Sequence, residues 1–123
     1  MAGGAQQFVD EVALGPGAWQ QLPEQARQTF VTNAPTFLAE MQDPLAALTV
    51  DLTALGRFPH PVLLTQGGQS PPTFAPIMDK LAQALPQAKR QTFPDAGHVP
   101  HQSQPDRYVE VVSQFLAAVP SRT

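Results

Sequence analysis

His98 is the residue whose type and position most directly suggest chemistry. It follows Gly97 within residues 92–101, TFPDAGHVPH, where a short apolar strand is expected to run into a tight turn that the glycine relieves. An imidazole can take a proton from a nucleophile near neutral pH and return it to a leaving group. A general base must be held rigidly and must face a cleft. A turn at the C-terminal end of a parallel strand provides both.

The local sequence alone favours a plainer interpretation, in which His98 is a turn histidine bonded to nearby backbone, because Gly-His dipeptides are common. The order of the surrounding elements favours a base instead. His101 lies three residues further on, but no carboxylate or cysteine accompanies the pair at metal spacing, so a rim or capping role is expected. His60, between Pro59 and Pro61, is interpreted as a loop residue.

The composition excludes several other kinds of site. The chain has no cysteine, which excludes disulfides, a thiolate nucleophile and zinc sites built on cysteine. Gly67-Gly68 lacks the further glycine or lysine that a phosphate loop requires, so it is better explained as a turn. No metal and no cofactor is expected.

The second half of the chain predicts the elements that would position His98. Residues 61–66, PVLLTQ, are typical of a strand buried on both faces in a parallel sheet. After a glycine-rich loop, apolar residues recur at helical spacing over residues 74–85. Residues 88–93 predict a second strand, and a last amphipathic helix begins at Pro105. This order predicts an α/β fold with a parallel β-α-β-α unit.

The first 58 residues predict short helices and no strand. Residues 5–14 form a helix that the segment 15–17, GPG, brings to an end. At the other end of this part, residues 45–48 are expected to add a turn, and Asp51 to cap a last helix that ends at Gly56. The first helix is expected to place four residues on one face: Phe8, Val9, Val12 and Ala13.

Prolines divide the middle of this helical part. A helix is expected over residues 23–33, with the proline in its first turn. Pro35 is expected to open a separate helix, with Asn33 or Ala34 as its cap, and residues 43–44 are expected to close it.

Several features in a fixed order carry a resemblance to a known family. They are the strand and glycine over residues 61–67, a helix ending in Leu85-Pro86, a second strand, residues 97–100 (GHVP) and a helix starting at Gln104-Pro105. Together they resemble the C-terminal portion of the α/β-hydrolase enzymes. In that family the catalytic histidine follows the last strand directly after a glycine. The resemblance covers nearly the whole chain.

The resemblance implies a division of the chain and a set of roles. Residues 1–58 would be a helical cap-like segment, and residues 59–123 the C-terminal strand-helix-strand-helix part of an α/β-hydrolase core. His98 would be the general base of a serine hydrolase acting on an ester or similar small apolar substrate. Trp19, Phe30 and Phe37 would line its substrate pocket, although they are explained equally well as packing among short helices.

Other parts of the catalytic apparatus are missing from the sequence. The family's nucleophile lies in a Gly-x-Ser-x-Gly elbow, and none of the four serines has those flanking glycines. The family often places an acid three residues after the glycine that ends the first of these strands, and that position is Ser70, which cannot replace a carboxylate. Some relatives carry the acid after an earlier strand, which would precede Met1. Asp95 is expected to face solvent.

Charge and hydropathy limit the partners. Hydrophobic residues make up 42% of the chain and charged residues 14%, with a net charge of −3. The sequence therefore has no basic face for nucleic acid, no run long enough to span a membrane and no secretory leader pattern, so a cytoplasmic location is the default expectation.

Two hypotheses follow. The chain is the cap and C-terminal portion of a serine hydrolase, inactive without a nucleophile supplied by other sequence. Alternatively, it is a non-catalytic remnant or interaction module, whose two strands associate with a partner or with another copy through an open edge. The partner is a small-molecule substrate in the first case and a protein surface in the second.

Overall fold

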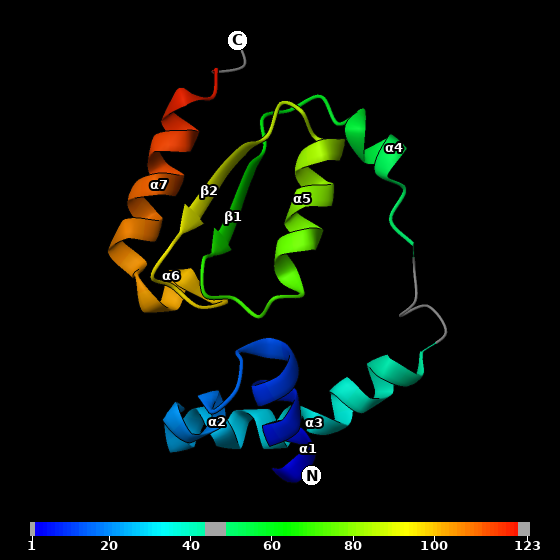
Figure 1. Cartoon of the computed structure of the whole chain (residues 1–123), viewed down its shortest axis with the longest axis vertical. Helices are drawn as coiled ribbons and strands as arrows, with labels where there is room; N and C mark the ends of the chain where they lie inside the picture. Colours follow the sequence, from blue (N-terminus) through cyan, green and yellow to red (C-terminus); the bar gives the residue numbers. More distant parts are fainter. Residues whose placement is uncertain (1, 44–48, 121–123) are drawn as a thin grey trace. The chain divides into compact units, whose positions relative to one another are not determined.

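The computed structural model describes residues 2–43 and 49–120, and these form two compact units that divide between Val50 and Asp51. The helix at residues 52–56 groups with the strands, whereas the resemblance implies that residues 51–58 belong to the helical segment. The elements in chain order are α1 (Ala2–Phe8), η1 (Val9–Ala13), α2 (Ala18–Gln21), α3 (Glu24–Gln42), α4 (Leu52–Gly56), β1 (Leu63–Gly67), α5 (Phe74–Ala84), β2 (Lys89–Phe93), α6 (Pro100–Ser103) and α7 (Pro105–Ala118) (Figure 1).

The first helix ends in a widened turn that the sequence did not predict. α1 passes into the π-helical segment η1, where the Leu14 N–H donates to the Val9 carbonyl five residues back, at 2.9 Å. Val9 is completely buried, whereas Val12 is 53% exposed. Val9 and Val12, which were predicted to share one face of the helix, thus differ in burial, because the wider turn shifts the register of the side chains.

Trp19 lies at the centre of the first unit. Its core contains Ala5, Val9 and Trp19, with residues of α3 packed around them. Gly17 precedes α2 with a φ of 80°, which favours glycine, and the Trp19 N–H donates to a carboxylate oxygen of Asp10 at 2.8 Å. This bond ties the start of α2 to η1. The predicted end of the first helix at residues 15–17 is confirmed.

α3 is one continuous helix that contains Pro35. The prediction that Pro35 opens a separate helix capped by Asn33 or Ala34 is wrong. A proline in a helix interior removes one backbone hydrogen bond but need not end the helix when neighbouring turns are packed. The Asn33 side chain instead donates to the Thr29 carbonyl one turn earlier, at 2.8 Å. The turn expected at residues 45–48 lies outside the described residues.

The second unit contains the predicted parallel β-α-β-α arrangement. Asp51 caps α4, as expected, because its carboxylate accepts from the Ala54 N–H at 2.9 Å. β1 and β2 are parallel, with Leu63 opposite Lys89 and Gly67 opposite Phe93. α5 connects the two strands and α7 follows them, while the short helix α6 was not predicted.

The two faces of this small sheet differ in chemistry. Alternate residues of a strand point to opposite faces. On one face, Leu63 and Phe93 pack with Val111 and Tyr108 of α7, and the Tyr108 hydroxyl lies 3.1 Å from Oγ1 of Thr65. α5 covers the other face (Figure 1), where Arg90 bonds to Gln66 and Asp79. Apolar packing therefore holds α7, and polar contacts contribute to holding α5.

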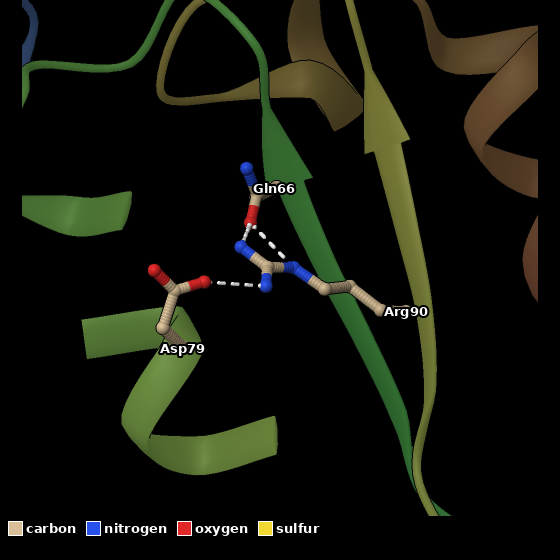
Figure 2. Close-up of polar contacts among 3 residues, drawn as sticks. All are labelled: Gln66, Asp79 and Arg90. Carbon is tan, nitrogen blue, oxygen red and sulfur yellow. Dashed lines mark hydrogen bonds and ion pairs between the residues drawn. The ribbon is translucent and has the colours of Figure 1, made fainter. Parts of the chain in front are cut away.

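The polar contacts under α5 centre on Arg90. Figure 2 shows its guanidinium between Gln66 of β1 and Asp79 of α5. Nε and Nη2 of Arg90 donate to Oε1 of Gln66, at 3.0 and 2.5 Å, and Nη1 lies 2.6 Å from a carboxylate oxygen of Asp79. One β2 side chain thus links both strands to α5. The ion pair is partly exposed, so its share of the stability is expected to be small.

The strands are less buried than predicted. In β1, Leu63 to Gln66 are half-buried and only Gly67 is buried, so the expectation of a strand buried on both faces is not met. Within the described residues the sheet has two strands, which leaves each strand with one edge that no neighbouring strand covers. No described helix has the length and apolar composition needed to cross a membrane.

Candidate functional site

Two loops meet at the carboxyl ends of the parallel strands. Residues 68–73 follow β1, and residues 94–99 follow β2. The Gly68 N–H donates to the Phe93 carbonyl at 2.8 Å, and the Gln69 N–H donates to the Ala96 carbonyl at 2.9 Å. These bonds hold the two loops together at the end of an α/β sheet where ligands usually bind.

Gly67 allows this close approach. A Cβ built on Gly67 would lie 1.8 Å from the Gly97 carbonyl oxygen and 2.6 Å from that of Ala96, so only glycine fits. A Cβ on Gly97 would meet nothing within 4 Å, and the φ of Gly97 is not positive. The expectation that Gly97 relieves a tight turn is therefore wrong, because the steric requirement lies at Gly67 in the opposite loop.

His98 lies half-buried in the second of these loops. Its imidazole stacks on the ring of Phe74, with the ring centroids 3.8 Å apart and the planes inclined by 25°. Phe74 is the first residue of α5, so the stack joins the two loops at their far ends. Across residues 2–43 and 49–120, no hydrogen bond or ion pair reaches the imidazole.

The nearby polar residues do not provide an acid. Ser70 is half-buried, and its backbone N–H donates to the Gly67 carbonyl at 3.2 Å, which closes the turn after β1. Asp95 is exposed in the loop after β2, as predicted. Neither residue forms an ion pair with His98 in the described part of the chain. Within residues 2–43 and 49–120, the imidazole thus contacts the Phe74 ring and has no carboxylate partner.

The other two histidines lie apart from this arrangement. His101 is exposed on α6 and meets the edge of the Tyr108 ring, with centroids 5.8 Å apart. His60 is exposed before β1 and meets Phe58 edge-on, with centroids 5.3 Å apart. No group of three or more potential metal-binding side chains occurs among the described residues.

The predicted substrate-binding residues all lie in the first unit, but in two different settings. Trp19 is buried in the core and is only 8% exposed. Phe30 and Phe37 line an apolar cavity of about 280 Å³ between α1 and α3. The Phe37 ring stacks there on the Phe8 ring, with the ring centroids 4.7 Å apart. The full lining is Gly4, Ala5, Phe8, Phe30, Ala34, Phe37, Leu38 and Met41.

Sequence reasoning did not identify Phe74 as part of the site. Its apolar side chain fits the helical stripe of residues 74–85, so packing explained it fully. The one available indication was its position at the start of the helix that directly follows the first loop. A small hollow of about 40 Å³ lies there, lined by Gln66, Gly67, Gly68, Ser70, Pro71, Phe74 and Ala75.

Comparison with known proteins gives one match. A family model described as the alpha/beta hydrolase family matches residues 2–111, which include parts of both compact units. No curated protein and no solved structure matches the chain significantly.

Proposed function

The chain belongs to the α/β-hydrolase family, and on this premise we propose that it is the cap-like and C-terminal part of a serine hydrolase with His98 as its general base. The substrate is an ester or a similar small apolar molecule. The nucleophilic serine comes from polypeptide outside these 123 residues, since none of their serines lies in a Gly-x-Ser-x-Gly segment. The chain alone is expected to be inactive.

The position of His98 is the observation that carries this proposal. Its loop follows β2 of a parallel pair, and backbone hydrogen bonds join that loop to the one after β1. Active sites in such folds lie beyond the carboxyl ends of the strands. A half-buried imidazole in this place, with no hydrogen bond to the described residues, has both nitrogens available for catalysis.

The proposed reaction follows the usual order of acyl transfer. One imidazole nitrogen of His98 takes the proton from the serine hydroxyl as the serine oxygen attacks the ester carbonyl carbon. The imidazolium then gives this proton to the departing oxygen, which leaves as an alcohol. The same imidazole then takes a proton from water as the water oxygen attacks the acyl-serine. The carboxylic acid product is released as the serine oxygen regains a proton from the imidazolium.

The acid that would orient the imidazole is also proposed to lie outside this chain. Ser70 occupies the position where many relatives carry a carboxylate, and a hydroxyl does not stabilise an imidazolium comparably. The alternative position, after an earlier strand, would belong to the same missing segment as the nucleophile. Both absent groups then come from a single stretch of polypeptide.

The apolar cavity of the first unit supports the choice of substrate. Phe30 and Phe37 offer aromatic surface to a ligand, and a 280 Å³ space suits a small acyl or aryl group. Trp19 is proposed to act less directly, because it is buried in the core against which Phe30 packs. Ester groups carry no charge, in keeping with an uncharged lining.

A fluorophosphonate tests the proposal, because it modifies only serines that a base has activated. The coding sequence before Met1 is expected to contain a Gly-x-Ser-x-Gly segment, and its absence there would contradict the proposal. A longer polypeptide that contains both that segment and these 123 residues should be labelled on the elbow serine. Labelling should disappear in His98→Ala and persist in His101→Ala. If the elbow serine is still labelled in His98→Ala, His98 is not the base that activates it.

A non-catalytic interaction module is the second candidate, and the free edge of β1 favours it. Lys89 is exposed on β2, and a charge of this kind discourages edge-to-edge association. β1 has no charged residue between Leu63 and Gly67. Under this proposal the chain self-associates, which sedimentation velocity would detect. A well-folded monomer at high concentration would contradict it.

A further inference from the structure

We propose that Phe74 is a positioning residue, which fixes the plane of the His98 imidazole. The catalytic meaning of this inference rests on the proposed role of His98 as a base. Its structural content does not, because the stack of the two rings is a property of this chain alone.

The contact has the geometry of a supporting surface. The centroids are 3.8 Å apart and the planes are inclined by 25°, so the phenyl face covers one face of the imidazole. The nitrogens lie on the edge of the imidazole ring, which a face-to-face stack leaves uncovered. Phe74 therefore restricts rotation of the ring without occupying the atoms that would exchange protons.

The backbone around Phe74 is itself well held. Its N–H donates to the Pro71 carbonyl at 3.1 Å, and its Cα begins an eleven-residue helix. The loop that precedes it is bonded to the loop of His98 through Gln69 and Ala96. Both partners of the stack are thus anchored to the same pair of strands.

This support supplies part of what a carboxylate does for a catalytic histidine. A carboxylate orients the ring and stabilises its positive charge. The phenyl face orients the ring, and its negative quadrupole attracts an imidazolium within about 6 Å of the centroid. It has no acceptor, so it does not select which nitrogen carries the proton. That selection is left to the acid proposed to lie outside this chain.

Proton NMR of the 123-residue chain tests the inference directly. Phe74→Leu keeps an apolar residue at the start of α5 but removes the aromatic face. The ring protons of His98 should then shift downfield, and its side-chain couplings should change to averaged values. Phe74→Tyr should restore the upfield shift and a single rotamer. The inference would be overturned if the His98 ring protons in Phe74→Leu kept the chemical shifts of the unsubstituted chain and the couplings still indicated a single rotamer.

Phe58→Leu is the matched control. Phe58 also contacts a histidine, but it meets His60 edge-on with centroids 5.3 Å apart. The substitution should move the resonances of His60 and leave those of His98 in place. A change at His98 of the same size as in Phe74→Leu would mean that the effect is not local, and would also overturn the inference.

Kinetics then separate this inference from the proposed function. In the polypeptide that also carries the elbow serine, Phe74→Leu should lower kcat with little change in KM, and Phe74→Tyr should restore it. If His98→Ala keeps full activity, the proposed function fails while the NMR result still decides the stack. If His98→Ala is inactive but Phe74→Leu is fully active, only the role of Phe74 in catalysis fails.

Discussion

At the scale of single residues, the place of His98 depends on a glycine in the neighbouring loop. Gly97 precedes His98 in the sequence, and the Gly-His pair correctly drew attention to this turn. The expectation that the turn needs a glycine at residue 97 was wrong, since a Cβ at Gly97 would meet no atom within 4 Å. The close contact lies across the sheet at Gly67, which sequence inspection cannot pair with Gly97 because 30 residues separate them.

Gly67→Ala is predicted to destabilise the second unit by about 3 kcal/mol or more, the upper end of the cost of forcing atoms into a packed site. Its methyl group would lie 1.8 Å from the Gly97 carbonyl oxygen, so one of the two backbones must move. Hydrogen exchange of the β1 and β2 amides measures the change.

Gly97→Ala is the control for this substitution. It adds the same methyl group on the other side of the same contact, where there is open space. The expected change is within about 0.5 kcal/mol, as for surface substitutions in general. Equal losses of unfolding free energy in Gly67→Ala and Gly97→Ala would show that the two loops do not meet in the way described.

The sequence identified the position of His98 but not its surroundings. A histidine after the last strand is a local feature, which the order of elements makes visible. The stack on Phe74 is not local, because it brings together the start of α5 and the loop after β2. Ser70 lies where the family often carries an acid and Asp95 is near His98 in sequence, but neither forms an ion pair with His98 in the described structure.

At the scale of elements, periodicity predicted the second unit well and the first unit less well. The two strands and the helices α5 and α7 have simple repeats and lie within about two residues of their predicted bounds, whereas the short helix α6 was not predicted. The first unit breaks simple rules twice. The π-helical turn η1 shifts the register, and Pro35 lies inside a helix instead of opening one.

Pro35→Ala is predicted to stabilise the first unit. It adds an N–H that can donate to the Val31 carbonyl within α3, and Pro35 is exposed, so nothing is lost from the core. Proline costs up to about 3 kcal/mol relative to alanine in a helix interior, and part of this gain is expected. The fluorescence of Trp19, the only tryptophan, reports urea unfolding of this core.

Pro105→Ala serves as the comparison. Pro105 lies in the first turn of α7, where a proline removes no helical hydrogen bond, so circular dichroism should show no gain in helix stability. A Pro35→Ala variant whose Trp19 transition moves to lower urea would contradict the account of α3. The proline would then have a favourable role that its exposure and position do not explain.

At the scale of the whole molecule, one family covers two units of different character. The family match extends from residue 2 to residue 111, so the helical unit and the strand unit both belong to it. The sequence predicted this fold class because the order of elements survives in the chain. It did not predict that β1 would be only half-buried, because burial depends on neighbouring strands that pattern alone does not reveal.

The rate of ester hydrolysis with and without His98 is the most direct test of the central claim. It is measured with p-nitrophenyl butyrate on the polypeptide that carries both the elbow serine and this chain. His98→Ala should lower kcat/KM by about 10²- to 10⁴-fold, the usual contribution of a general base, while His101→Ala stays close to the unsubstituted rate. Equal rates for His98→Ala and the unsubstituted polypeptide would contradict the account.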